Sequence, residues 1–144
     1  MAAFSELLGN LSDDANVRGR QFERICQWYL LHDPGYRAQI KKVWLWDDWP
    51  GRWGPDAGID LVAETHDRRL WAIQAKAYDP AYRITKHDVD TFLSESARPQ
   101  FHYRLLIATT NLIGKKALRT LQEQEKPRRT HAPVRPSEVR CRVA

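Results

Sequence analysis

Three polar residues have the types and spacing of a site that handles a metal ion and a water molecule. Asp60 follows a glycine and one apolar residue, and a short polar turn separates it from a second apolar run carrying Gln74 and Lys76. Strand side chains alternate between faces, so Gln74 and Lys76 point the same way. Carboxylate and amide oxygens beside an ammonium group can hold a hard cation and activate water. The alternative is an ordinary two-stranded hairpin whose polar residues face solvent.

The turn of this hairpin decides whether Asp60 can join the other two residues. A two-residue turn at Asp67–Arg68 would place Asp60 opposite Ala75, on the wrong face, whereas a three-residue loop from Asp67 would place it opposite Lys76. The Asn-Gly or Asp-Gly pair that favours a two-residue turn is missing. We therefore expect an odd-length loop, or an even one compensated by a β-bulge near Asp60.

Hydrophobic periodicity predicts the elements that must position this hairpin. We expect helices over Ser12–His32, Lys86–Ser96 and Lys115–Glu125, and strands over Lys42–Asp48, Ile59–Thr65, Leu70–Ala77 and Tyr103–Thr109. The step from Ala77 through a helix to Tyr103 is a crossover, which makes a parallel strand pair. The sequence therefore predicts an α/β domain with a small mixed β-sheet and helices on both faces.

Composition bounds the class of protein. The chain has 144 residues, the size of one domain, and 42% hydrophobic residues, as in ordinary globular proteins. Its apolar runs are far shorter than the roughly 20 residues of a membrane span, and its start lacks the pattern of a secretory signal. The two cysteines, Cys26 and Cys141, form no zinc or disulfide spacing. We expect a reduced, cytoplasmic protein with no membrane partner.

The net charge of +5 comes from the end of the chain. Residues 126–144 hold six Lys or Arg and one acid, whereas the rest has 17 basic and 17 acidic residues. We expect a domain over 1–126 and a basic, disordered tail over 127–144 that contributes salt-sensitive DNA affinity. Local candidates for DNA contacts are Arg52 and Trp53 in a tryptophan-rich loop, and Lys86. Alternatively, the loop tryptophans pin that loop to the core.

Several blocks of sequence resemble a known family. A helical Glu23, then GIDL, then QAK is similar to the Mrr-type branch of the PD-(D/E)xK nuclease superfamily, in which Gln replaces the usual acid. FERICQWYLLHDP, KKVWLWDDWP, DAGIDLVAE, LWAIQAKAY, VDTFLSES and ATTN resemble the N-terminal nuclease domain of Type ISP restriction–modification enzymes, over residues 18–126. The resemblance implies a restriction-endonuclease-like fold.

The resemblance also implies a role for each site residue. Asp60 would be the central metal-binding carboxylate, and Gln74 would give a side-chain oxygen to the metal. Lys76 would position or activate the attacking water, and Glu23, otherwise a solvated helix acid, would complete the site. The main-chain carbonyl of Ala75 would be a further ligand. Mg²⁺ suits this set because it prefers oxygen ligands and keeps several waters.

The implied function is Mg²⁺-dependent endonuclease cleavage of double-stranded DNA within a restriction–modification system. A homodimer would allow double-strand cleavage. The family places a helicase-like translocase and a methyltransferase after the nuclease, whereas this chain ends at Ala144. A truncated or frameshifted product and a free-standing nuclease both remain open. The alternatives to an enzyme are a catalytically inactive DNA-binding module that retains the fold and, third, a structural interaction domain.

Overall fold

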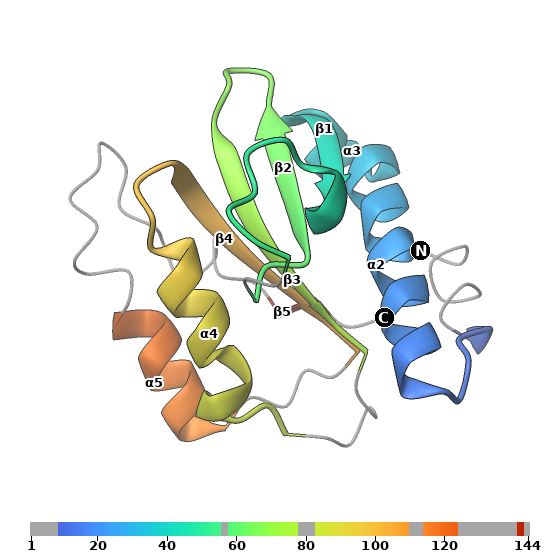
Figure 1. Ribbon diagram of the computed structural model, residues 1–144, viewed down its shortest axis with the longest axis vertical. Coiled ribbons are helices and arrows are strands. Elements are labelled where there is room, and N and C mark those ends of the chain that lie inside the picture. Colours follow the sequence, from blue (N-terminus) through green and yellow to red (C-terminus); the bar gives the residue numbers. More distant parts are fainter. Residues whose placement is uncertain (1–8, 56–57, 78–82, 110–113, 124–140, 143–144) are drawn as a thin grey trace.

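The computed structural model describes residues 9–55, 58–77, 83–109, 114–123 and 141–142 (Figure 1). Its helices are α2 (Ala15–His32), α3 (Pro34–Arg37), α4 (Lys86–Ser96) and α5 (Lys115–Glu123), with a 3₁₀ turn η1 (Trp46–Asp48). Its strands are β1 (Ile40–Leu45), β2 (Leu61–Thr65), β3 (Leu70–Lys76), β4 (Phe101–Ala108) and β5 (Cys141–Arg142). Every predicted helix and strand is therefore present, with β1 beginning two residues early and giving way to η1 before Asp48.

The strands form one mixed sheet in the order β1-β2-β3-β4-β5. The pairs β1–β2 and β2–β3 are antiparallel, whereas β3–β4 and β4–β5 are parallel. The crossover through α4 thus makes the parallel pair that was predicted. Strand β5 lies within the tail that was expected to be disordered, so that expectation is wrong at Cys141 and Arg142; the remainder of the tail, apart from these two residues, lies outside the described residues.

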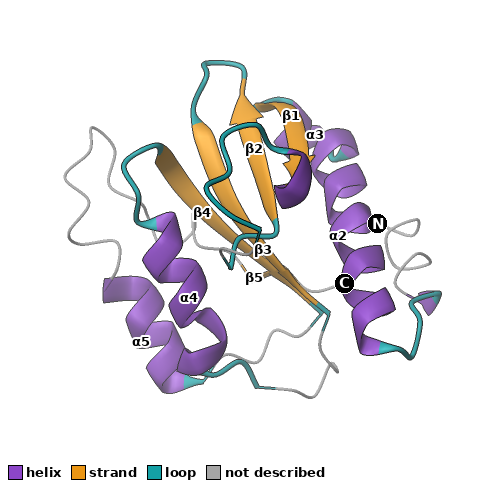
Figure 2. Cartoon of the chain, viewed as in Figure 1, coloured by secondary structure: helices purple, strands orange, loops and turns teal. Residues whose placement is uncertain are grey.

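Helix α2 covers one face of the sheet, and α4 and α5 cover the other (Figure 2). Alternate residues of β3 serve the two cores: Ile73 packs with Phe22 of α2, whereas Ala72 packs with Phe92 of α4. The α/β architecture with helices on both faces is confirmed. Both faces are covered because β3 lies inside a partly parallel sheet.

One charged side chain is built into the α4 face. Arg104 of β4 is 1% exposed. Its Nε donates to Ser96 Oγ over 2.8 Å, and its Nη2 donates to the Leu93 carbonyl over 3.5 Å. Buried polar groups require such partners, so this guanidinium ties the end of α4 to β4.

The β2–β3 hairpin has the predicted odd-length loop, displaced by one residue. Thr65 donates its N–H to the Arg69 carbonyl over 2.9 Å, which leaves three residues, 66–68, in the loop. Arg68 has φ 66° and donates to the Thr65 carbonyl over 3.0 Å, as in three-residue hairpins. Leu61 is paired with Ile73, so continuing this register places Asp60 beside Gln74 rather than Lys76.

Candidate active site

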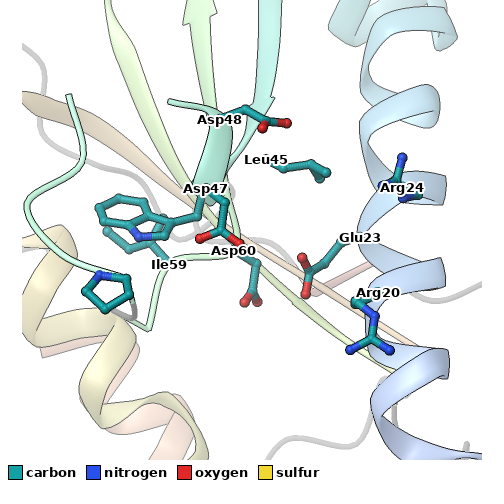
Figure 3. Close-up of a pocket in the computed structure, with 10 residues that line it drawn as sticks. Arg20, Glu23, Arg24, Leu45, Asp47, Asp48, Ile59 and Asp60 are labelled. Atoms are coloured by element: carbon teal, nitrogen blue, oxygen red, sulfur yellow. The ribbon is translucent and has the colours of Figure 1, made fainter. Parts of the chain in front are cut away.

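A pocket of about 350 Å³ opens where β1 ends and β2 begins. It lies between α2, η1 and the segment leading to β2, and Figure 3 shows the side chains that line it. The lining residues are Arg20, Glu23, Arg24, Leu45, Trp46, Asp47, Asp48, Pro55, Ile59 and Asp60. Four of them are acids and two are arginines, so the pocket is strongly charged.

Helix α2 carries Glu23 to this pocket. Asp14 caps the helix by accepting the N–H groups of Asn16 and Val17, as N-cap residues do. Phe22 and Cys26 are buried against the sheet, which turns Glu23 toward the sheet end. Figure 3 shows its carboxylate directed at Asp60.

The environment of Glu23 favours its protonated form. Burial, followed by the charges of Asp60 and Asp47, raises the pKa of Glu23 to about 7, against the opposing charges of Lys76 and Arg20. A carboxyl group among other carboxylates resists ionisation in this way. The pocket therefore holds more negative charge than its own cations balance, and a divalent cation would relieve that excess.

Asp60 is fixed by three hydrogen bonds at the end of the sheet. Its N–H donates to the Ile73 carbonyl over 2.9 Å, and its carbonyl accepts the Trp46 N–H over 2.9 Å. Its Oδ2 accepts the Ala75 N–H over 2.8 Å. Asp60 and Leu61 thus share Ile73 as a partner, as two residues do in a β-bulge. This irregularity aims the carboxylate at Glu23 across the face that α2 covers.

Gln74 lies on the other side of the same strand end. It is 3% exposed, its Nε2 donates to the Gly58 carbonyl over 3.4 Å, and its Oε1 has no hydrogen-bond partner within the described residues. Gly58 has φ 69°, and a Cβ there would lie 2.7 Å from Thr91 Cγ2 of α4. Only glycine suits this position, so α4 and Gly58 together seat the segment that leads to Asp60.

The structure brings together part of the predicted site. Glu23 and Asp60 line one pocket, and Lys76 is close enough that its charge opposes the rise in the pKa of Glu23 that burial causes. Gln74 does not line the pocket. Within the described ranges, no three His, Cys, Asp or Glu side chains form a group that could hold a metal ion. The ligand role of the Ala75 carbonyl stays a prediction.

The residues predicted to contact DNA lie outside the pocket. The Trp53 ring packs against Trp46 at 4.9 Å between centroids, and the Arg98 guanidinium lies 3.7 Å from its centre. Arg52 donates to the Trp49 carbonyl over 3.2 Å. Lys86 pairs with Asp90 at 3.0 Å. The tryptophans thus hold their loop against the core, as the alternative interpretation expected.

Sequence reasoning did not single out Arg20, Arg24, Asp47 and Asp48. Arg20 lies three residues before Glu23, a spacing that makes the two side chains neighbours on a helix surface. Arg24 follows Glu23 directly in the sequence. The two aspartates follow β1 directly, and the pairing of Leu45 with Leu61 places them level with Asp60. The sequence could have indicated that Asp47 and Asp48 approach Asp60, but only if the register of β1 against β2 had been known.

Comparison with known proteins assigns a family. A family model described as a restriction endonuclease, Mrr_cat_2, matches residues 31–134. The match covers most of the chain and includes Asp60, Gln74 and Lys76, whereas Glu23 precedes it. The chain belongs to this restriction endonuclease family.

One solved structure shares the fold. An ATP-dependent Type ISP restriction–modification enzyme, LlaBIII, solved bound to DNA, superposes with a TM-score of 0.69 at 23% identity. The match covers 98% of this chain and 8% of that chain, so this chain is similar to a small part of a much longer enzyme. The predicted resemblance and the restriction-endonuclease-like fold are confirmed. A search of curated proteins found no match, and no described helix is long and apolar enough to cross a membrane.

Proposed function

We propose that this chain is a Mg²⁺-dependent DNA endonuclease domain that hydrolyses phosphodiester bonds, of the PD-(D/E)xK type, within a Type ISP-like restriction–modification system. The observation that carries the proposal is the meeting of Glu23 and Asp60 in one charged pocket, with Lys76 nearby, in a member of a restriction endonuclease family. These side chains suit the hydrolysis of a phosphate diester, because acids can hold a cation and an ammonium group can orient water.

The donor set fits a hard divalent cation. Glu23 and Asp60 supply carboxylate oxygens, and the cation would offset the charge repulsion that raises the pKa of Glu23. Gln74 lies outside the pocket as described, but its buried amide oxygen has no hydrogen-bond partner in the described part of the chain, and we propose it as a further ligand on that ground. The Ala75 carbonyl would complete the set. Oxygen ligands of this kind suit Mg²⁺.

Each residue has a definite task in the proposed reaction. A Mg²⁺ ion held by Glu23 and Asp60 would supply charge neutralisation at the reacting phosphate. Asp60 is held rigidly by the Ala75 N–H and the Ile73 carbonyl, so its carboxylate is oriented before the substrate arrives. Lys76 orients the attacking water with its ammonium group. Glu23 on α2 adds a second carboxylate beside that of Asp60 in the pocket.

The proposed substrate is duplex DNA, and the proposed context is a larger assembly. A helicase-like translocase and a methyltransferase would act with this domain in a Type ISP-like system. Each domain holds one candidate site, which would cut one DNA strand. Cleavage of both strands would require two domains, which a homodimer would supply. A domain that holds the phosphate backbone takes its target sequence from other modules.

A nicking assay tests the proposal. Supercoiled plasmid is incubated with the whole chain and Mg²⁺, with EDTA as the metal-free control. Wild type is expected to convert the plasmid to the nicked form, and Asp60→Ala and Lys76→Ala are each expected to abolish conversion. Asp67→Ala is the matched control because Asp67 is an exposed acid in the hairpin loop. Equal activity of Asp60→Ala and wild type would refute the assignment.

A second candidate function is an inactive DNA-binding module that keeps the fold. The observation favouring it is that Gln74 does not line the pocket holding Glu23 and Asp60. This alternative predicts duplex binding by wild type with no nicking in Mg²⁺ or Mn²⁺. The two functions are therefore separated by the same assay combined with a binding measurement.

A further inference from the structure

Two arginines flank Glu23 on the surface of α2. Arg20 and Arg24 both line the pocket and are both exposed. Figure 3 shows Glu23 lying between them along the helix. They are four residues apart, one helical turn or about 6 Å of rise, so they form one cationic strip at the pocket edge.

Neither side chain ties elements of the described structure together, although the charge of Arg20 acts on Glu23. Neither has an ion pair or a side-chain hydrogen bond there, although four carboxylates line the same pocket. Arg18 on the same helix is different, because it donates to the carbonyls of Ala77 and Asp13. Arg18 therefore secures the helix, whereas Arg20 and Arg24 line the pocket without such bonds in the described part of the chain.

The charges of the pocket show what these cations would do. Glu23, Asp47, Asp48 and Asp60 together repel any phosphate that approaches. A divalent cation at Glu23 and Asp60 balances two of these charges, and the two guanidinium groups balance the other two. A planar guanidinium also makes paired hydrogen bonds to phosphate oxygens, which an ammonium group does not.

We propose that Arg20 and Arg24 are positioning residues that bind backbone phosphates of the DNA strand entering the pocket. This inference rests on the proposed function and assigns the DNA contacts to α2, rather than to Arg52, Trp53 or Lys86. The two guanidinium groups hold phosphates beside the reacting one and thereby align it with Asp60 and Lys76. Contacts of this kind carry no base specificity.

The test is the salt dependence of duplex binding. Affinity for a labelled DNA duplex is measured in EDTA, where cleavage cannot occur, between 50 and 200 mM salt. Each phosphate contact contributes about 0.9 to the slope of log affinity against log salt. Arg20→Ala and Arg24→Ala are each expected to reduce the slope by about 0.9, which is roughly an eightfold loss of affinity at 0.1 M salt. In the double variant, in which both Arg20 and Arg24 are replaced by Ala, the slope is expected to fall by about twice as much as in either single variant.

Matched variants separate positioning from general effects. Arg20→Lys and Arg24→Lys keep the charge, so they should keep the slope while nicking slows. Arg37→Ala removes an exposed arginine of α3 that does not line the pocket, and it should leave slope and nicking unchanged. Circular dichroism confirms that each variant is folded.

The outcomes distinguish this inference from the proposed function. A double alanine variant with the wild-type slope refutes the arginine contacts, and Asp60-dependent nicking would then still support the nuclease. Reduced slopes without any nicking by wild type support the arginine contacts and refute the nuclease. A wild-type chain that binds no duplex at 50 mM salt refutes the arginine contacts, and the nicking assay in Mg²⁺ then decides the nuclease separately.

Discussion

The Ala75 N–H donates to Asp60 Oδ2 over 2.8 Å, so a side chain of the candidate site completes the hydrogen bonding of the sheet. Strand β2 begins at Leu61, and in the described part of the chain its pairing with β3 ends at Ile73. The Asp60 carboxylate accepts the Ala75 N–H, which a backbone carbonyl would accept if β2 were longer. The same carboxylate group thus faces the pocket and stabilises the end of β3.

Removing the Asp60 carboxylate should therefore cost stability as well as activity. In Asp60→Ala the Ala75 N–H loses its acceptor in a largely buried position, which costs about 1–3 kcal/mol of unfolding free energy. Asp60→Asn keeps a side-chain oxygen and should recover most of this loss while remaining inactive. Urea denaturation measures the difference. Asp48→Ala, at an exposed acid of the pocket wall, is the control and should change stability little.

The raised pKa of Glu23 predicts a stability change with pH. Between its ordinary value of 4.5 and about 7, folded Glu23 keeps a proton that the unfolded chain releases. The folded state then binds more protons, so the unfolding free energy falls as pH rises through this window. Metal-free Glu23→Gln should lack this fall and be more stable than wild type at pH 8.

The measurement is urea denaturation in EDTA at pH 5, 7 and 8. The advantage of Glu23→Gln should shrink from pH 8 to pH 5, since wild type is then protonated. Glu64→Gln on β2, whose side chain does not line the pocket, provides the control. An advantage for Glu23→Gln that is equal at pH 5 and pH 8 would argue against a buried, charge-repelled carboxyl.

Replacing Gln74 with glutamate should strengthen metal binding. The change adds one negative charge where a buried oxygen has no hydrogen-bond partner among the described residues. Titration calorimetry with Mg²⁺ or Mn²⁺ measures the affinity, and Gln74→Glu should bind more tightly than wild type. Equal or weaker affinity would count against Gln74 as a ligand. Glu64→Asp serves as the control for a strand acid remote from the pocket.

Gly58 should tolerate no side chain. Its φ of 69° costs an alanine about 1–2 kcal/mol, and the added Cβ would also lie 2.7 Å from Thr91 Cγ2. Gly58→Ala should lower the unfolding free energy by at least this amount and reduce nicking. Gly19→Ala is the matched control because nothing lies within 4 Å of its Cβ position in α2. It should stabilise the protein by up to about 1 kcal/mol.

Local patterns were sufficient for the fold. The apolar spacing of α2, the Thr85 cap of α4 and the apolar run of β4 each predicted an element that the structure contains. The crossover rule then gave the parallel pair of β3 and β4. These features depend on residues that are close in sequence or on the handedness of crossover connections. They can therefore be predicted from a single sequence.

The site depended on relations that local patterns do not carry. The loop lies one residue earlier than predicted, at 66–68, which shifts the strand pairing by two residues, and the bulge-like bonding of Asp60 turned its carboxylate toward α2. Gln74 and Lys76 share a face by alternation, yet alternation does not say which face Asp60 adopts once its strand has ended. Asp47 reached the pocket through the pairing of β1 with β2. Tertiary register decided these positions.

The buried Arg104 has a consequence for the opposite side of the sheet. Apolar contacts alone would let α4 rotate or slide, whereas hydrogen bonds from one guanidinium to Ser96 and Leu93 fix its orientation. That orientation holds Thr91 against Gly58, and Gly58 begins the segment that delivers Asp60. The geometry of the pocket is therefore set partly by the core on the α4 side of the sheet, which reaches the pocket wall at Trp46 and Ile59. A mutation of Arg104, which does not itself line the pocket, would act on the site through that core.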